Sequence, residues 1–232
     1  MLSSIMRLRT VGGKNMTEKI LIAPSILSGD FANMGESVRL LEEWGGDIVH
    51  CDVMDGVYVT NITFGMPMVA ALRKRTDKVM DAHLMITEPE KYVSRFADAG
   101  ADIITFHPEA SKDAERCLKI IKESGKRCGL VFNPDVPIEE YKHLFPLCDM
   151  IVVMTVYAGY GGQKLIERCI DRIREVKAIL DGLGLNIPIE ADGGIDENNA
   201  AKVREAGATI LVAGSSVYKS KDPAESIRKI RG

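Results

Sequence analysis

Short runs of apolar β-formers alternate along this chain with longer stretches of mixed apolar and polar residues. In segments such as "EKYVSRFADAG" (90–100) and "KLIERCIDRIREVKAIL" (164–180), apolar residues recur at the 3.6-residue spacing of an amphipathic helix. The connection at 63–76 carries the weakest helical pattern. Strand-like runs begin near Ile20, Asp47, Lys78, Asp102, Cys128, Asp149, Asn186 and Thr209. The alternation predicts eight strand–helix units.

Three similar segments support the same count. "WGGDIVHCD", "AGADIITFH" and "AGATILVAG" each place a glycine suited to a helix C-terminus shortly before a β-branched run. The glycines, Gly45, Gly100 and Gly207, are separated by 55 and 107 residues. If one unit takes roughly 27 residues, these intervals correspond to two and four units.

Regular alternation of strands and helices predicts a parallel sheet, and eight units predict a single (β/α)₈ TIM barrel over residues 17–232. An open, doubly wound sheet is the alternative, but no G-x-G-x-x-G follows the first strand. Residues 1–16, "MLSSIMRLRTVGGKNM", contain no acidic residue. We expect them to be an N-terminal extension outside the barrel, either disordered or non-native, with a weak transit peptide as the alternative.

Composition narrows the class of protein. The 232 residues are 46% hydrophobic with a net charge of −3. The sequence contains no basic block of the kind that marks nucleic-acid-binding proteins. No apolar stretch approaches the roughly 20 residues that span a bilayer. The five cysteines are odd in number and form no C-x-x-C pair, which favours reduced thiols in a cytoplasmic protein.

Polar side chains gather at the ends of three predicted strands. His50 and Asp52 are two residues apart, so their side chains lie on one face of a strand. His83 ends the third strand in "DAHLM", and Asp192 ends the seventh in "IEADGG". Each alone is commonly a buried core histidine or a turn aspartate. Four at equivalent positions predict a site for a divalent metal.

Glycine-rich loops follow the sixth, seventh and eighth strands: Gly159–Gly162, Gly193–Gly194 and "GSS" at 214–216. Glycine lets backbone N–H groups approach an anion closely, and the last loops of such barrels commonly bind phosphate. Each loop alone is equally typical of a tight turn. Together they predict a phosphate monoester beside the metal, and hence a small sugar phosphate as substrate.

The motifs "SILSGDF", "VHCDVMDGVYVTNITFG", "DAHLMITEPEKY", "AGADIITFHPEA", "VMTVYAGYGGQ", "IEADGGI" and "LVAGSSVY" closely resemble the ribulose-phosphate 3-epimerase family. The resemblance runs from about Ile20 to the C-terminus. It implies a (β/α)₈ barrel that interconverts ribulose 5-phosphate and xylulose 5-phosphate. It also implies that Asp52 and Asp192 are the acid/base pair and that both, with His50 and His83, are ligands of one divalent metal.

The resemblance also implies how the protein assembles and what it binds. It implies a homo-oligomer. Zn²⁺ is the metal that two histidines and two aspartates suit best, with Fe²⁺, Mn²⁺ or Co²⁺ as alternatives. The methionines would form polarizable walls around the enediolate. The implied substrate contacts are Ser25, His83, Met54, Met85, Met154, Gly159, Tyr160, Gly161, Gly162, Gly193, Gly194, Gly214 and Ser215.

Two loops depart from the usual family pattern. "VYVTN" carries Val57 and Thr60 where the family usually has His and Pro, and Tyr157-Ala158 replaces Asn-Pro. "HPE" at 107–109 and "VMTV" at 153–156 are more similar to allulose-6-phosphate 3-epimerases. A hexulose-6-phosphate 3-epimerase is therefore the alternative function.

Two further classes remain less favoured. Phosphosugar decarboxylases of related barrels carry D-x-K-x-x-D on a strand end, and here Met54 stands at the lysine position of "DVMD". A non-catalytic phosphate-binding barrel would not need two carboxylates beside two histidines.

Overall fold

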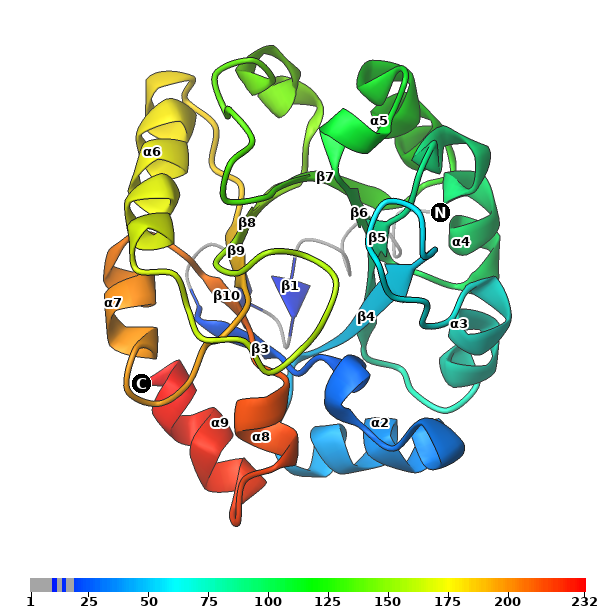
Figure 1. Cartoon of the computed structure of the whole chain (residues 1–232), viewed down its shortest axis with the longest axis vertical. Helices are drawn as coiled ribbons and strands as arrows, with labels where there is room; N and C mark the ends of the chain where they lie inside the picture. The colour runs from blue at the N-terminus through cyan, green and yellow to red at the C-terminus, as the bar shows by residue number, and fades with distance from the viewer. Residues whose placement is uncertain (1–9, 12–13, 16–18) are drawn as a thin grey trace.

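The computed structural model describes residues 10–11, 14–15 and 19–232, and eight parallel strands ring its centre (Figure 1). Their hydrogen-bonded order is β3-β10-β9-β8-β7-β6-β5-β4. The ring closes between β3 and β4, where the Asp47 N–H donates to the Ile22 carbonyl at 2.8 Å and Ser25 bridges to His50. The predicted barrel is confirmed. The strands are β3 (Leu21–Ala23), β4 (Ile48–Met54), β5 (Val79–Met85), β6 (Ile103–Phe106), β7 (Arg127–Phe132), β8 (Met150–Met154), β9 (Ile189–Asp192) and β10 (Ile210–Val212).

Helices cover the outside of the ring. The weak helical pattern at 63–76 forms a helix that begins after Gly65, with proline in its first turn. The α-helices are α2 (Met34–Glu43), α3 (Met66–Arg73), α4 (Val93–Ala99), α5 (Ala114–Glu123), α6 (Arg168–Gly182), α7 (Ala200–Glu205), α8 (Ser215–Tyr218) and α9 (Pro223–Arg231). Short 3₁₀ turns are η1 (Ile26–Ser28), η2 (Phe31–Asn33), η3 (Pro89–Lys91) and η4 (Pro108–Ala110).

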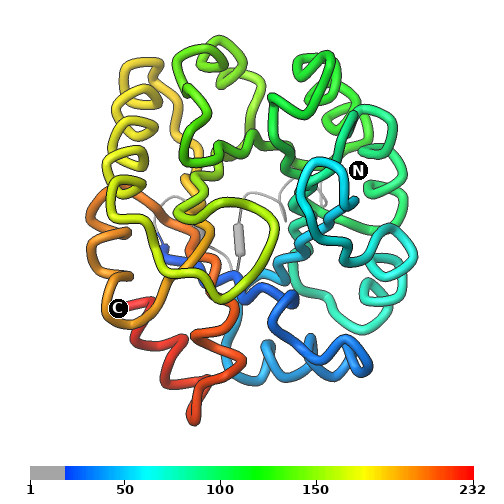
Figure 2. Tube along the Cα trace, in the orientation of Figure 1, coloured from blue at the N-terminus to red at the C-terminus, as the bar shows by residue number. Residues whose placement is uncertain are grey.

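Two connections differ from the regular pattern. Between β7 and β8 the chain forms a 3₁₀ helix, η5 (Lys142–Leu147), with Pro146 inside it. Proline lacks the N–H that an α-helix interior requires, which limits this segment to a short tight helix. The periodic stretch at 164–180 becomes helical only at Arg168, and the residues before it extend the loop from β8. Figure 2 shows this connection curving across the middle of the ring.

Alternation along each strand separates two cores. On β4, Val49, Cys51 and Val53 pack against the outer helices, whereas Ile48 points into the barrel with His50 and Asp52 on the same face. The barrel interior is filled by a separate apolar cluster, formed by Leu21, Ala23, Ile48, Ile103, Val131, Met150, Val152, Met154, Val156, Ile210 and Val212. The polar side chains at the strand ends therefore rest on a closely packed apolar cluster inside the barrel.

The predicted extension at 1–16 lies mostly outside the described residues. Within it, β1 (Thr10–Val11) and β2 (Lys14–Asn15) form an antiparallel pair. The state of the extension as a whole stays a prediction.

All five cysteines are free and buried. Among the described residues, no helix is both long and apolar enough to cross a membrane.

Candidate active site and metal centre

Four side chains from three strands meet inside the barrel. His50 and Asp52 come from β4, His83 from β5 and Asp192 from β9. His50 Nε2 lies 3.5 Å from Asp52 Oδ1 and 3.5 Å from Asp192 Oδ2. His83 Nδ1 lies 3.5 Å and 3.3 Å from the same two oxygens. Each imidazole nitrogen thus faces both carboxylates.

The arrangement fits a tetrahedral metal ion. The four ligand atoms lie within 4.8 Å of one another, and all four residues are buried. Ligand atoms about 2.0–2.1 Å from a tetrahedral centre are separated by about 3.3–3.4 Å, close to the four distances above. His50 Nε2 and His83 Nδ1 are fully buried and make no hydrogen bond. Two unpaired ring nitrogens facing two carboxylates are the donor set that Zn²⁺ and its neighbours prefer.

Charge pairing sets the protonation of this cluster. Burial raises the pKa of Asp52 and Asp192, but the facing imidazoles outweigh burial and hold both pKa values below the usual range. Burial likewise lowers the pKa of His50 and His83, and the two carboxylates outweigh it and raise both values. The two imidazoles and the two carboxylates thus stabilise one another's charged forms.

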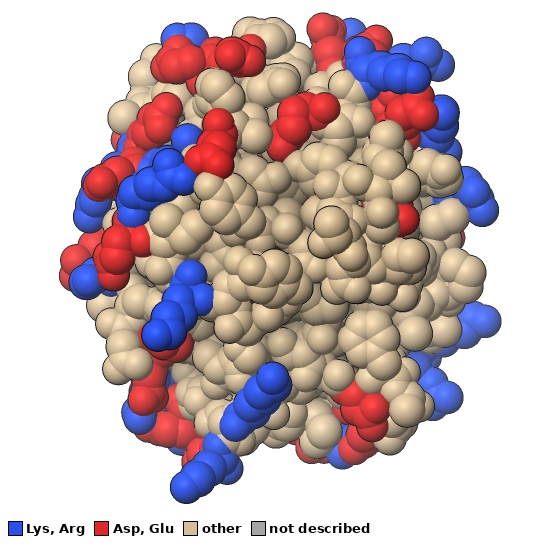
Figure 3. All heavy atoms as spheres, viewed as in Figure 1, with Lys and Arg blue, Asp and Glu red and all other residues tan. Residues whose placement is uncertain are grey.

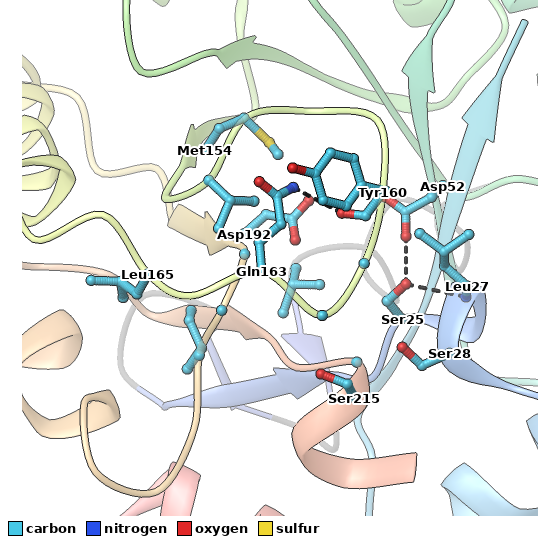
Figure 4. Close-up of a pocket in the computed structure, with 18 of the residues that line it drawn as sticks. Ser25, Leu27, Ser28, Asp52, Met154, Tyr160, Gln163, Leu165, Asp192 and Ser215 are labelled. Carbon is cyan, nitrogen blue, oxygen red and sulfur yellow. Dashed lines mark hydrogen bonds between the residues drawn. The ribbon is translucent and has the colours of Figure 1, made fainter. Parts of the chain in front are cut away.

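Neighbouring polar groups hold three of the four side chains. His50 Nδ1 lies 2.9 Å from Asp81 Oδ2, and Ser25 Oγ donates to Asp52 Oδ2 (Figure 4). His83 Nε2 lies 3.0 Å from Nε2 of His107. The carboxylate on His50 directs its Nδ1 proton away from the cluster and leaves Nε2 free, as in many metal sites.

A cavity of about 660 Å³ opens above the two carboxylates. This volume is typical of sites for small ligands. Asp52 and Asp192 line it, whereas His50 and His83 are fully buried and do not. His83 therefore reaches the cavity only through its carboxylate neighbours. The other predicted substrate contacts all line the cavity: Ser25, Met54, Met85, Met154, Gly159, Tyr160, Gly161, Gly162, Gly193, Gly194, Gly214 and Ser215.

The three predicted glycine loops all line the cavity. Gly193 and Gly194 both adopt positive φ angles, +121° and +66°, which favour glycine. A Cβ on Gly194 would lie 2.4 Å from the Leu165 backbone nitrogen, so the loops after β8 and β9 touch backbone to backbone. Ser215 begins α8 beside them. The three turns thus border one cavity, and phosphate binding by them stays a prediction.

The loop after β8 is tied down at several points. Asn61 Nδ2 donates to the Gly159 carbonyl at 3.1 Å, and Gln163 Nε2 donates to the Tyr157 carbonyl at 2.7 Å. Tyr157, one of the departures from the family pattern, donates its hydroxyl proton to Asp135, which also pairs with Arg168.

Figure 3 shows the face of the molecule seen in Figure 1, with charged side chains around its edge and a largely uncharged middle.

Three functional candidates were missed in the sequence. Asp81, Glu190 and His107 are fully buried beside the cluster. Burial and the nearby charge of Asp81 raise the pKa of Glu190 well above its usual value. Asp81 lies two residues before His83, and Glu190 two before Asp192. The period-2 rule that joined His50 to Asp52 predicts both.

Comparisons with known proteins agree with this geometry. A family model described as the ribulose-phosphate 3 epimerase family matches residues 21–218. The chain is 47% identical to a ribulose-phosphate 3-epimerase from Synechocystis, covering 93% of this chain and 95% of the relative. It is 46% identical to one from Bacillus subtilis, covering 92% and 99%. The crystal structure of KGPDC from Streptococcus mutans shares the fold, with a TM-score of 0.71, 12% identity and coverage of 92% and 96%.

Proposed function

This chain belongs to the ribulose-phosphate 3-epimerase family, and we propose that it inverts C3 of a ketose phosphate, converting D-ribulose 5-phosphate to D-xylulose 5-phosphate. One observation carries the proposal. Asp52 and Asp192 project into one cavity from strands three places apart around the ring. Inversion requires an acid/base group on each face of the reacting carbon, and this pair supplies both.

The reaction follows from that placement. The C3 proton lies next to the C2 ketone, so one carboxylate takes it as the C–H electron pair moves toward the C2 oxygen. The other carboxyl group delivers a proton to the opposite face of C3, and the electron pair returns from oxygen. The return reaction exchanges the two roles. Ser25, hydrogen-bonded to Asp52 Oδ2, orients that carboxylate.

The same four side chains would hold a divalent cation. His50, Asp52, His83 and Asp192 offer two nitrogens and two oxygens at spacings suited to tetrahedral Zn²⁺, and Fe²⁺, Mn²⁺ or Co²⁺ are alternatives. A cation bound here would stabilise the negative charge that develops on the substrate oxygens after proton removal.

The glycine loops would bind the phosphate. Gly193, Gly194, Gly214 and Ser215 all line the cavity that contains the two carboxylates, and their backbone N–H groups are suited to an anion. Anchoring the phosphate there places the sugar chain across Asp52 and Asp192. From family membership we further propose a homo-oligomer that acts in the cytoplasm.

A hexulose 6-phosphate is the second candidate substrate. Tyr157 lines the cavity where the family pattern has asparagine, and its hydroxyl donates to Asp135. A changed side chain at this point would alter how much of a longer sugar fits. The proposal keeps the pentulose phosphate as substrate because the relatives at 46–47% identity carry that name.

One experiment tests both candidates. The purified protein is incubated in D₂O with D-ribulose 5-phosphate and, separately, with D-allulose 6-phosphate. We expect ¹H NMR to show the C3 epimer with deuterium at C3, formed faster from the pentulose. Removing the metal with a chelator should abolish turnover, and added Zn²⁺ should restore it. Deuterium exchange without inversion, or a faster reaction with the hexulose, would contradict the proposal.

A further inference from the structure

Three of the four histidines of this chain stand in a row inside the barrel. The ring centroids of His50 and His83 are 5.5 Å apart, and those of His83 and His107 are 5.1 Å apart. His107 follows β6 and is fully buried, yet it contributes nothing to the four-residue cluster. The "HPE" segment that contains it has no part in the proposed reaction.

The contact between His83 and His107 links the protonation of the two rings. Their Nε2 atoms are 3.0 Å apart, so one of them donates a proton and the other accepts it. If His83 Nδ1 presents its lone pair to the cluster, its proton must be on Nε2. His107 Nε2 is then the acceptor, and the proton of a neutral His107 lies on Nδ1.

The outer side of His107 is built to receive that Nδ1 proton. Glu109 Oε1 lies 3.5 Å from Nδ1 and accepts the Tyr58 hydroxyl proton at 2.7 Å. Asn133 accepts from the Ala158 N–H through Oδ1, so its amide nitrogen must face inward. That nitrogen donates to the Tyr58 hydroxyl at 2.7 Å and lies 3.3 Å from His107 Nδ1 and 3.4 Å from Glu109 Oε1. When the His107 proton lies on Nδ1, the second Asn133 proton is directed to Glu109, and this carboxylate is the charged acceptor beside Nδ1.

We propose that His107, oriented by Glu109, is a positioning residue that accepts the Nε2 proton of His83 and so holds His83 Nδ1 toward the metal cluster. His107 and Glu109 thus keep the proton of His83 on the ring nitrogen that faces away from the cluster, as Asp81 does for His50. An imidazole relay differs from a direct carboxylate in one respect, because it links a metal ligand through Glu109 and Asn133 to Tyr58 and to Ala158, which lines the cavity. The inference rests on the metal site of the proposed function.

The test measures metal binding. His107→Phe keeps a ring but removes the acceptor, whereas His107→Gln can place an amide oxygen where Nε2 lies. Glu109→Gln keeps the shape of the outer residue and removes its charge. His143→Gln is the matched control, since His143 is exposed on η5. Apo protein of each variant is titrated with Co²⁺ against a competing chelator, and the visible absorption of the bound ion is recorded.

We expect His107→Phe to weaken Co²⁺ binding about 10–100-fold and to change the absorption band, as removal of an outer-shell partner commonly does. His107→Gln should recover most of the affinity, Glu109→Gln should fall between the two, and His143→Gln should match the wild type. Wild-type affinity and spectrum in His107→Phe would overturn the proposal, as would equal losses in His107→Phe and His107→Gln.

The outcomes also separate this inference from the proposed function. If His107→Phe does not fold, Glu109→Gln decides, and wild-type Co²⁺ affinity in that variant refutes the relay. A wild-type protein that binds Co²⁺ through this cluster but epimerises neither sugar phosphate would refute the proposed function alone. A wild-type protein that binds no Co²⁺ would overturn both.

Discussion

Gly194→Ala should damage the enzyme through one backbone contact. Gly194 adopts φ +66°, and an added Cβ would lie 2.4 Å from the backbone nitrogen of Leu165 and 2.8 Å from the Gln163 carbonyl oxygen. Both neighbours are main-chain atoms, so no rotamer change relieves the clash. The loop after β9, which belongs to the proposed phosphate site, must separate from the loop after β8.

The size of the effect follows from two contributions. A left-handed conformation costs a residue with Cβ about 1–2 kcal/mol. Forcing a methyl group into a packed contact costs about 1–3 kcal/mol more. A loss of about 2–5 kcal/mol should lower Tm by about 4–20 °C in a chain of this size. A shift of about 1 Å in the phosphate position should also reduce kcat/KM about 100-fold.

Gly161→Ala provides the matched control. Gly161 lies in the same cavity wall, its φ is outside the left-handed region, and an added Cβ meets no atom nearer than Leu27 Cδ2 at 3.7 Å. We expect its Tm to change by no more than about 2 °C, because a substitution without clash or strain usually changes stability by under about 0.5 kcal/mol. The assay is epimerisation of D-ribulose 5-phosphate, with Tm from calorimetry. Equal Tm and kcat/KM in the two variants would refute the reasoning.

Three further predictions concern the acid/base pair, the loop after β4 and the substrate. Asp192→Asn should fold normally and lose about 10²–10⁴-fold in epimerisation rate, and near wild-type turnover in that variant would exclude two-carboxylate chemistry. Partial burial raises the pKa of Asp55, but hydrogen bonds from three backbone N–H groups outweigh it and lower the value from 3.8. The Asp55 carboxylate therefore stabilises the fold at pH values above its usual pKa, and this contribution is lost as the pH falls through the lowered pKa of the folded state. Asp55→Asn should flatten the fall of Tm between about pH 6 and pH 3. An unchanged slope of Tm against pH would contradict this prediction. Restoring asparagine and proline at Tyr157 and Ala158 should raise the ratio of kcat/KM for the pentulose over the hexulose phosphate; an unchanged ratio would place substrate choice elsewhere.

The strands could be predicted because parallel strands buried on both faces are continuous apolar runs. β4 and β5 are almost entirely buried, and their sequences show it directly. The connection from β7 to β8 could not be assigned in the same way. Its 3₁₀ helix is too short for a 3.6-residue period to emerge, and Pro146 removes a helical hydrogen bond.

The candidate site was predictable in part for a related reason. Period-2 alternation places His50 and Asp52 on one face of β4 without any structure. Their partners on β5 depend on the register between strands, which pairs His50 with Asp81 and Asp52 with His83. Register between parallel strands follows from packing of the whole barrel, and the sequence of either strand leaves it open. His107 lies beyond the end of β6, so its contact with His83 has no local signature.

The polar groups inside this barrel are hard to explain as devices for stability. His50, Asp81, His83, His107 and Glu190 are all fully buried, in a layer where other strands place valine, isoleucine and methionine. Burying each charged group costs several kcal/mol unless its partners compensate, and well-packed apolar side chains of similar volume often stabilise a fold more. Yet both ring nitrogens that face the cluster, and both carboxylate oxygens of Glu190, make no hydrogen bond. Costly polar groups gathered in and around one cluster beneath a cavity are the arrangement expected where binding a cation and moving a proton outweigh the cost.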